Sequence, residues 1–425
     1  MLTRTTHPVR EVAAGAAGYR DGRLSLDLDA LTALVTDDPR IAAAHLAVVQ
    51  PGERTRVLNV LDVFDARKKE DGPTYPGFDG PPVAAGSGRT HVLDGFQIVA
   101  SGLLPTGEGG LMVARQAFID YWGEGARWSP FAATPTLAVD VRLDPAIQDK
   151  AVADDAVRRA LIRLSTAIGA LAVDAADGAD EQVPASWERP SAAAGGPPRV
   201  AYVYQIQSQG ALLETFLYGA DIAFMYPTLI EAAELLDGAM VSGNHGLQTN
   251  PTVHHTSNPV LRRLLAEERA GRLTLLPVVL MEGHHKSTPA KQRSAAHAVQ
   301  LLRALRAEGA VFTQEGGGMS IVDQMLTIEG ATAAGIRCVG ITYEMAGEQG
   351  ADTPLIYYSS AARHLVSTGN REERVTVDAA ERVVGLDTGE STFGANLGGP
   401  LTVPLYALYC STSQVGGTRV RAVAV

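Results

Sequence analysis

The stretch PVVLMEGHH, Pro277–His285, joins an apolar run to three polar side chains. Short apolar runs bounded by proline and glycine are typical of strands buried in a parallel sheet. Because open α/β proteins bind ligands beyond the carboxyl ends of such strands, we expect Glu282, His284 and His285 to face a site. The same arrangement, an apolar run followed by a glutamate, recurs later in the chain at Glu315 and Glu344.

Strand and helix patterns alternate on both sides of this stretch. Apolar runs precede the helical patterns, among them VAYVYQIQ, LTLLPVVLM, AVFTQ and IRCVGITY. This alternation predicts βαβ units, so we expect residues 199–425 to form an α/β domain with a mostly parallel sheet flanked by helices. One helix is expected near 210–218, and Ser320 with Asp323 resembles a capping box at the start of another.

The N-terminal half has a different pattern. Apolar runs such as HLAVVQ, TRVLNVLDVF and TLAVDVRL are separated by glycine and proline turns, which predicts a β-rich (α+β) domain over residues 1–173, mixed or barrel-like in arrangement. Apolar residues at helical spacing between 153 and 173 predict a helix that closes this domain. Residues 174–198 are rich in Ala, Gly, Pro and acidic side chains, and we expect a linker or a surface excursion.

The composition indicates a globular protein with a sizeable core: 425 residues, 46% hydrophobic and 20% charged. A net charge of -11 argues against nucleic acid and against an acidic membrane surface as partners. With only Cys338 and Cys410, the chain has no disulfide framework and no Cys-x-x-Cys zinc site. No apolar stretch reaches the length of a bilayer span and the N-terminus lacks a secretory pattern, so we expect a cytoplasmic protein.

The polar residues at the predicted strand ends suggest a metal-dependent site. Imidazole and carboxylate ligands suit zinc or another divalent ion, with candidate ligands Glu282, His245, His254, His255, His284 and His285. Candidate acid/base residues are Glu315, Glu344 and His245. Gly316 and Gly317 open a helix that favours an anionic group, and with Gln207 and Ser242 they are candidates for substrate binding.

Simpler interpretations stay open for each of these residues. The histidines are also compatible with loops on a polar surface, and adjacent histidines point in opposite directions on an extended chain. A tight strand-to-helix turn explains the glycines equally well, and a carboxylate such as Glu315 stabilises a helix start without any chemistry.

Long segments of the chain resemble the proprotein subunit of component B of the glycine, sarcosine and betaine reductases, and the related D-proline reductase proprotein. The resemblance rests on VVQPGERTRVLNVLDVFDARKK, YPGFDG and GSGRTHVLDG in the first half, and on DGAMVSGN, EGGGMSIVDQMLTIEGATAAGIRCVGITYEMAGEQG and YALYCSTSQVGGTRVRAVAV in the second. It implies an enzyme subunit that acts on a small amino-acid-derived substrate by C–N bond cleavage. It also implies a second reductase-like subunit and a hetero-oligomer.

The resemblance also implies a pyruvoyl group, made by self-cleavage at a cysteine that follows a Ser-Gly-Asn segment. This sequence has Ser242-Gly243-Asn244 followed by His245. Because imidazole cannot perform the acyl shift that the cleavage requires, we expect an uncleaved chain without a pyruvoyl group. A bound metal ion would then replace it as the electron-withdrawing group.

Three other functions remain open at this point: a non-catalytic scaffold subunit, a metal-dependent hydrolase or lyase, and a sensor that binds a carboxylate at the EGGG helix start.

Overall fold

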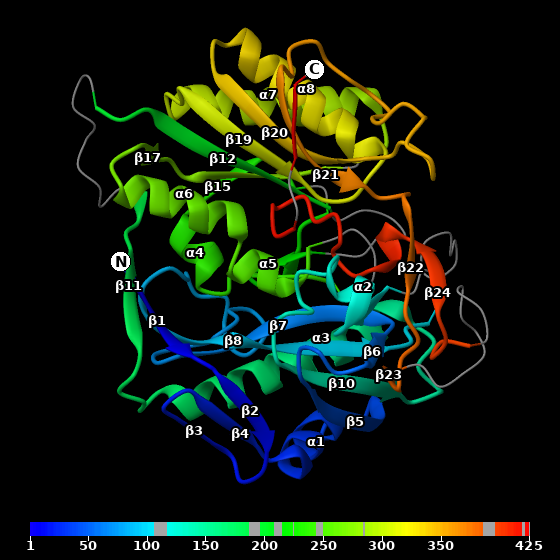
Figure 1. Ribbon diagram of the computed structural model, residues 1–425. Coiled ribbons are helices and arrows are strands. Elements are labelled where there is room, and N and C mark those ends of the chain that lie inside the picture. The colour runs from blue at the N-terminus through cyan, green and yellow to red at the C-terminus, as the bar shows by residue number, and fades with distance from the viewer. Residues whose placement is uncertain are drawn as a thin grey trace.

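The structure is a computed structural model that describes residues 1–425 except 106–116, 187–195, 208–214, 224, 244–249, 284, 386–395, 419–420 and 425, and except the side chains of 421–424. Its described residues form two large sheets, one from each half of the chain (Figure 1). Helices α4, α5 and α6 lie between them in the view of Figure 1. Among the described residues, no helix combines the length and the apolarity that a membrane span requires.

The first sheet belongs to the N-terminal half and is mixed. Its strand order is β11-β1-β8-β10-β5, and β7 also pairs with β8. The pairs β1–β8 and β8–β10 are parallel, whereas the other pairs are antiparallel. No closed barrel is formed by the described strands. The strands are β1 Leu2–Pro8, β5 Ile41–Val49, β7 Val60–Lys69, β8 Gly88–Gly102, β10 Thr136–Leu143 and β11 Ala179–Val183.

One face of this sheet packs on α3, Lys150–Gly169, and the short η1, Ala170–Ala172. The helix starts where Asp149 accepts hydrogen bonds from two backbone N–H groups of its first turn. Val157, Leu161, Leu164 and Ile168 then supply the buried stripe that the sequence predicted. Helix α1, Leu28–Thr36, covers the same side.

The second sheet has the order β15-β18-β12-β19-β20-β21-β25, with β17 beside β12. The interior pairs are parallel and only the edge strands β15 and β25 are antiparallel, which confirms the mostly parallel sheet. The strands are β12 Arg199–Ile206, β15 Thr228–Ile230, β17 Thr274–Leu275, β18 Val278–Glu282, β19 Gly309–Gln314, β20 Arg337–Glu344, β21 His364–Asn370 and β25 Arg421–Ala424.

Helices cover both faces of the second sheet. One face packs on α7, Thr288–Ala304, and α8, Met319–Ala333; the other packs on α4, Ala232–Leu236, and α6, Pro259–Arg269. The short α5, Thr252–Thr256, lies between α4 and the strand β7 of the first half. Strand β18 is covered on both faces, and every residue from Val278 to Glu282 is buried, as its apolar sequence indicated. Strands β12 and β19 also bury polar side chains, among them Gln205 and Gln314.

Smaller sheets connect these parts. The C-terminal β23 pairs in parallel with β6 of the first half, and β6 pairs with β9. Their bounds, and those of the remaining short elements, are β2 Glu11–Ala14, β3 Gly18–Arg20, β4 Arg23–Leu26, β6 Thr55–Leu58, β9 Phe118–Asp120, β13 Phe216–Leu217, β14 Ala220–Asp221, β16 Met240–Val241, β22 Arg374–Val377, β23 Arg382–Gly385, β24 Leu401–Pro404, α2 Gly123–Ala126 and η3 Leu405–Ala407.

A buried ion pair fixes this junction between the two halves. Arg56 Nε and Nη2 donate to the two carboxylate oxygens of Asp120 at 2.7 and 2.9 Å. Arg56 Nη1 donates to the carbonyl oxygens of Leu397 and Gly399, at 2.7 and 3.1 Å. The guanidinium is fully buried and therefore depends on these partners.

Two local predictions need correction. The helix expected near 210–218 is wrong where that segment is described, because Phe216–Leu217 forms strand β13 against β16. The capping box of Ser320 and Asp323 is also wrong. The N-cap of helix α8 is Gly318, two residues before Ser320, and Asp323 pairs with other side chains instead.

Candidate functional site

Glu315 lies at the carboxyl edge of the second sheet, directly after β19. One of its carboxylate oxygens accepts the N–H of Gln207 at 2.7 Å and the other accepts the N–H of Asn250 at 2.6 Å. The side chain is almost fully buried, and burial raises its pKa to about 7 although both N–H groups favour the charged form. At neutral pH this carboxyl can therefore accept or release a proton.

A second buried carboxyl comes from the N-terminal half. Asp62, on β7, accepts the N–H of Thr252 at 2.8 Å and its hydroxyl at 2.7 Å. Burial raises the pKa of Asp62 to about 7. The Thr252 hydroxyl in turn accepts the N–H of Ser242, at 3.0 Å. The two halves of the chain thus meet at α5, and the site draws residues from both.

Tyr409 and Cys410 lie close enough to both carboxyls to sense their charge. Burial is the main cause that raises the pKa of each well above its ordinary value, and the charges of Asp62 and Glu315 add to it. The Tyr409 hydroxyl is buried without a hydrogen-bond partner among the described residues. The Cys410 thiol therefore stays protonated at neutral pH and is a poor nucleophile.

His254 and His255 lie on helix α5 and not in the loop that was expected. His255 Nδ1 shares a hydrogen bond of 2.8 Å with the Tyr204 hydroxyl, and its Nε2 is buried without a described partner. His254 packs against the Phe131 ring, with centroids 5.2 Å apart. Burial lowers the pKa of both histidines to about 3, so both are neutral at physiological pH.

Glu282 and His285, at the end of β18, belong to a charged cluster. His285 Nδ1 lies 2.8 Å from one oxygen of Asp323, and Lys291 Nζ lies 2.5 Å from the other. His285 Nε2 is 4.0 Å from the carboxylate of Glu282, which is fully buried. The structure therefore brings these two predicted residues together and adds Asp323 and Lys291.

The glycine turn between β19 and α8 is surrounded by polar side chains. Gly316 has a φ of 73°, and a Cβ on it would overlap the Gln207 side-chain oxygen. A Cβ on Gly317 would overlap the Tyr343 hydroxyl, which accepts a hydrogen bond from Arg371 at 3.2 Å. Gln207 Nε2 is buried without a described partner. This turn therefore combines close-packed backbone, an unused amide donor and a buried guanidinium.

The remaining predicted residues are placed as follows. Glu344 ends β20 and accepts a hydrogen bond from the Ser367 hydroxyl. His245 and His284 lie outside the described residues. Within the described part of the chain, no group of three or more His, Cys, Asp or Glu side chains is arranged to hold a metal ion. The zinc expectation gains no support from these residues, and it stays a prediction for a site that includes His245 or His284.

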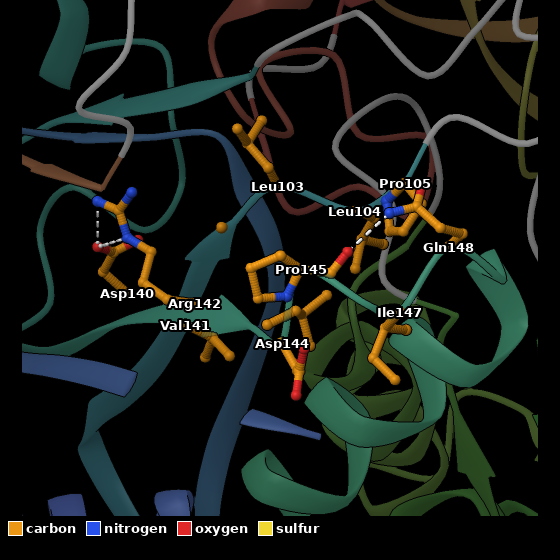
Figure 2. A pocket seen from close by; sticks show the side chains of 12 residues that line it. Leu103, Leu104, Pro105, Asp140, Val141, Arg142, Asp144, Pro145, Ile147 and Gln148 are labelled. Carbon is orange, nitrogen blue, oxygen red and sulfur yellow. Dashed lines mark hydrogen bonds and ion pairs between the residues drawn. The ribbon is translucent and has the colours of Figure 1, made fainter. Parts of the chain in front are cut away.

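A cavity of about 300 Å³ lies away from these residues, beside the ends of β8 and β10 (Figure 2). Its charged groups have partners: Asp140 and Arg142 form an ion pair of 2.8 Å, and Asp144 accepts the N–H of Ala146. Gln148 donates to the carbonyl of Pro145 at 2.8 Å. With its polar groups paired in this way, the cavity offers little for chemistry.

Sequence reasoning missed Asp62, Tyr409, Cys410, Asp323 and Arg371. One usable signal was Asp62 itself, because an acid inside the apolar run VLNVLDVF is unusual unless it is bonded or functional. The others join the site through contacts between segments far apart in the chain, which leave no local pattern.

Comparisons with known proteins agree with the sequence resemblance. The family model for glycine/sarcosine/betaine reductase component B subunits matches residues 1–422. The chain is 28% identical, over 93% of both chains, to "Glycine reductase complex component B subunits alpha and beta" of Peptoclostridium acidaminophilum. It is 30% identical to "Betaine reductase complex component B subunit alpha" of the same organism, over 89% of this chain and 86% of the relative.

A third relative is "Sarcosine reductase complex component B subunit alpha" of that organism, 28% identical over 89% of this chain and 87% of the relative. No solved structure is significantly similar to the chain. The match spans nearly the whole chain, so the protein belongs to the family of glycine/sarcosine/betaine reductase component B subunits.

Proposed function

We propose that this chain is the substrate-handling subunit of a reductase complex, and that Glu315 exchanges a proton with the substrate. The observation that carries the proposal is the buried Glu315 carboxyl at the carboxyl edge of a parallel sheet, with a pKa of about 7. Asp62, which also has a pKa of about 7, is a second proton-holding group in the same region.

The proposed substrate is a small amino-acid derivative, with glycine, sarcosine and betaine as the first candidates because the relatives are named for their reduction. Each carries a carboxylate and an amine-derived nitrogen. The glycine turn supports carboxylate binding, because its amides lie at the positive end of α8 beside Gln207, and Ser242 is buried nearby behind Thr252.

The proposed reaction is reductive cleavage of the C–N bond. The nitrogen leaves as an amine, and where it needs a proton Glu315 supplies it. Two thiols together give two electrons to the substrate carbon and become a disulfide, and each loses its proton. One of these protons adds to the carbon, so that a C–H bond replaces the broken C–N bond, and the other is released or restores the proton of Glu315. Burial raises the pKa of Cys338 and Cys410 and makes both poor nucleophiles, so those thiols would belong to a partner subunit.

We also propose that the chain stays uncleaved. The residue after Asn244 is His245, whose imidazole side chain cannot form a pyruvoyl group. The denatured protein should give a single mass of 44.7 kDa. Two fragments that divide the chain between Asn244 and His245 would refute this part.

A binding and turnover experiment tests the function. The purified chain is titrated calorimetrically with glycine, sarcosine and betaine, and amine release is then measured in the complex with its co-purified partner and a dithiol. At least one compound should bind saturably and release amine, and Glu315→Gln should reduce turnover by roughly a hundredfold, within the range typical of a lost acid/base group.

The matched control is Glu329→Gln, the same substitution at an exposed position on α8. If the partner alone released amine at the same rate, the chain would be a scaffold and the proposal would fail.

A further inference from the structure

A second cavity, of about 240 Å³, opens beside His285. It lies at the carboxyl end of β18, on the side of the edge strand β15. One wall is formed by the chain that enters β15, and the other by His285 and the first turns of α7. Its lining residues are Met225, Tyr226 and Pro227 on the first wall, and His285, Ala290, Arg293 and Ser294 on the second.

His285 is held rigidly at the edge of this cavity. Its Nδ1 lies 2.8 Å from Asp323 Oδ1, and Lys291 Nζ lies 2.5 Å from Asp323 Oδ2. Lys291 also donates to the carbonyl oxygen of Met319 at 3.0 Å. Asp323 and Lys291 are both buried, so the ring cannot easily rotate. Its other nitrogen, Nε2, makes no hydrogen bond with a described residue, since the Glu282 carboxylate is 4.0 Å away.

Two more polar groups face the same space without partners. Ser294 is only 4% exposed, and its hydroxyl has no hydrogen bond among the described residues. Leaving a buried hydroxyl unsatisfied is unfavourable, and a ligand that accepts a hydrogen bond from it would remove that cost. Arg293 is exposed and makes no ion pair with a described residue.

We propose that this cavity binds a small organic oxyanion, a carboxylate or a phosphate. Arg293 and the Ser294 hydroxyl bind its oxygens, His285 Nε2 contacts it from the side, and Met225 and Tyr226 contact its carbon part. The charge in the cavity favours an anion. Asp323 pairs with Lys291, and the buried Glu282, whose carboxylate is 4.0 Å from His285 Nε2, is not among the lining residues. Arg293 is therefore the uncompensated charge of the lining. The size admits a molecule of few heavy atoms and not a polymer.

This inference does not depend on proton exchange at Glu315, and its test is independent of turnover. The full-length protein, labelled with ¹⁵N-histidine and pretreated with a chelator, is titrated with inorganic phosphate, acetate, phenyl phosphate and benzoate. The imidazole signals of His285, assigned with His285→Asn, should shift saturably. The two probes with a ring should bind about tenfold more tightly than their inorganic or methyl counterparts, because the ring contacts Tyr226.

Two variants and a control define the site. Arg293→Gln should weaken binding by about tenfold or more, the loss of one charge-assisted contact. Ser294→Ala should weaken it less while leaving the fold intact, because the hydroxyl has no partner to lose. Arg303→Gln, an exposed arginine in the last turn of the same helix, should change nothing.

Saturation by the phosphates alone, or by the carboxylates alone, would identify the class of ligand. The proposal is overturned if no probe gives a saturable shift, or if Arg293→Gln binds as tightly as the unaltered protein.

Discussion

Replacing Glu315 with glutamine should change the stability of the protein in a way that depends on pH. In the folded protein its pKa lies at about 7 against an ordinary value of 4.5, so the folded state holds the proton more tightly than the unfolded state. Stability contributed by this proton is present below pH 4.5 and is lost as the pH rises through 7. A tenfold difference in proton affinity between the folded and unfolded states corresponds to about 1.36 kcal/mol. The free energy of unfolding therefore falls by about 3 kcal/mol as Glu315 loses its proton.

Glutamine does not titrate, so the free energy of unfolding of the variant does not fall in this way as the pH rises. At pH 5 its NH₂ group faces one of the two N–H donors, of Gln207 or Asn250, and an unsatisfied buried donor costs about 1–3 kcal/mol. The variant should therefore be less stable than the unaltered protein at pH 5. Near pH 8 the difference in free energy of unfolding between the two proteins should shrink or change sign. The total change in that difference should be about 3 kcal/mol, in favour of the variant.

Equilibrium urea denaturation at the two pH values measures this difference. Taking the difference between two proteins cancels the titration of all other groups, and Glu329→Gln controls for the substitution itself. A gap that stays constant between pH 5 and pH 8 would mean that Glu315 is ionised throughout. Its proposed role as a proton-exchanging group would then be wrong.

Two further predictions concern buried side chains, and a third concerns the zinc site expected from the sequence. Asp120→Asn should lower the free energy of unfolding, measured by urea denaturation, by about 3–5 kcal/mol, because it leaves the buried Arg56 guanidinium without its carboxylate. A decrease below about 1 kcal/mol would contradict the buried ion pair. Burial raises the pKa of Cys338 and Cys410, so iodoacetamide at pH 8 should add to neither in the folded protein and to both in denaturant, as mass spectrometry can count. If His245 completes a zinc site, the purified protein should carry about one equivalent of zinc that His245→Ala loses; a content below a tenth of an equivalent would rule the site out.

The parallel sheet of the second half was predictable because each strand has its own local signal. The runs that became β18 and β19 are mostly apolar and are followed by helical patterns, so strand, helix and direction were all readable. The runs of β12 and β20 were readable as strands only, because the helix expected after β12 is wrong where that segment is described, and β20 leads to β21. The positions of Glu282 and Glu315 at the carboxyl edge followed from the same reasoning.

The completed site was not predictable, because its other members arrive through contacts of long range. Asp62 reaches Thr252 across 190 residues of sequence. Asp323 matched a local capping pattern, yet the electrostatic gain from His285 and Lys291 outweighed that preference. Likewise, the pairing of β23 with β6 depends on tertiary packing, because a four-residue strand carries no information about a partner more than 300 positions away.

The strand order of the second sheet has a consequence for any break in the chain near residue 245. Strands β15 and β12 precede that point, whereas β18 and β19 follow it, and the order β15-β18-β12-β19 alternates between them. A nicked molecule would therefore remain one particle, with its fragments interleaved in a single hydrogen-bonded sheet. Gel filtration or a native gel would not distinguish it from the intact chain. Only a denaturing measurement can report whether the backbone is continuous.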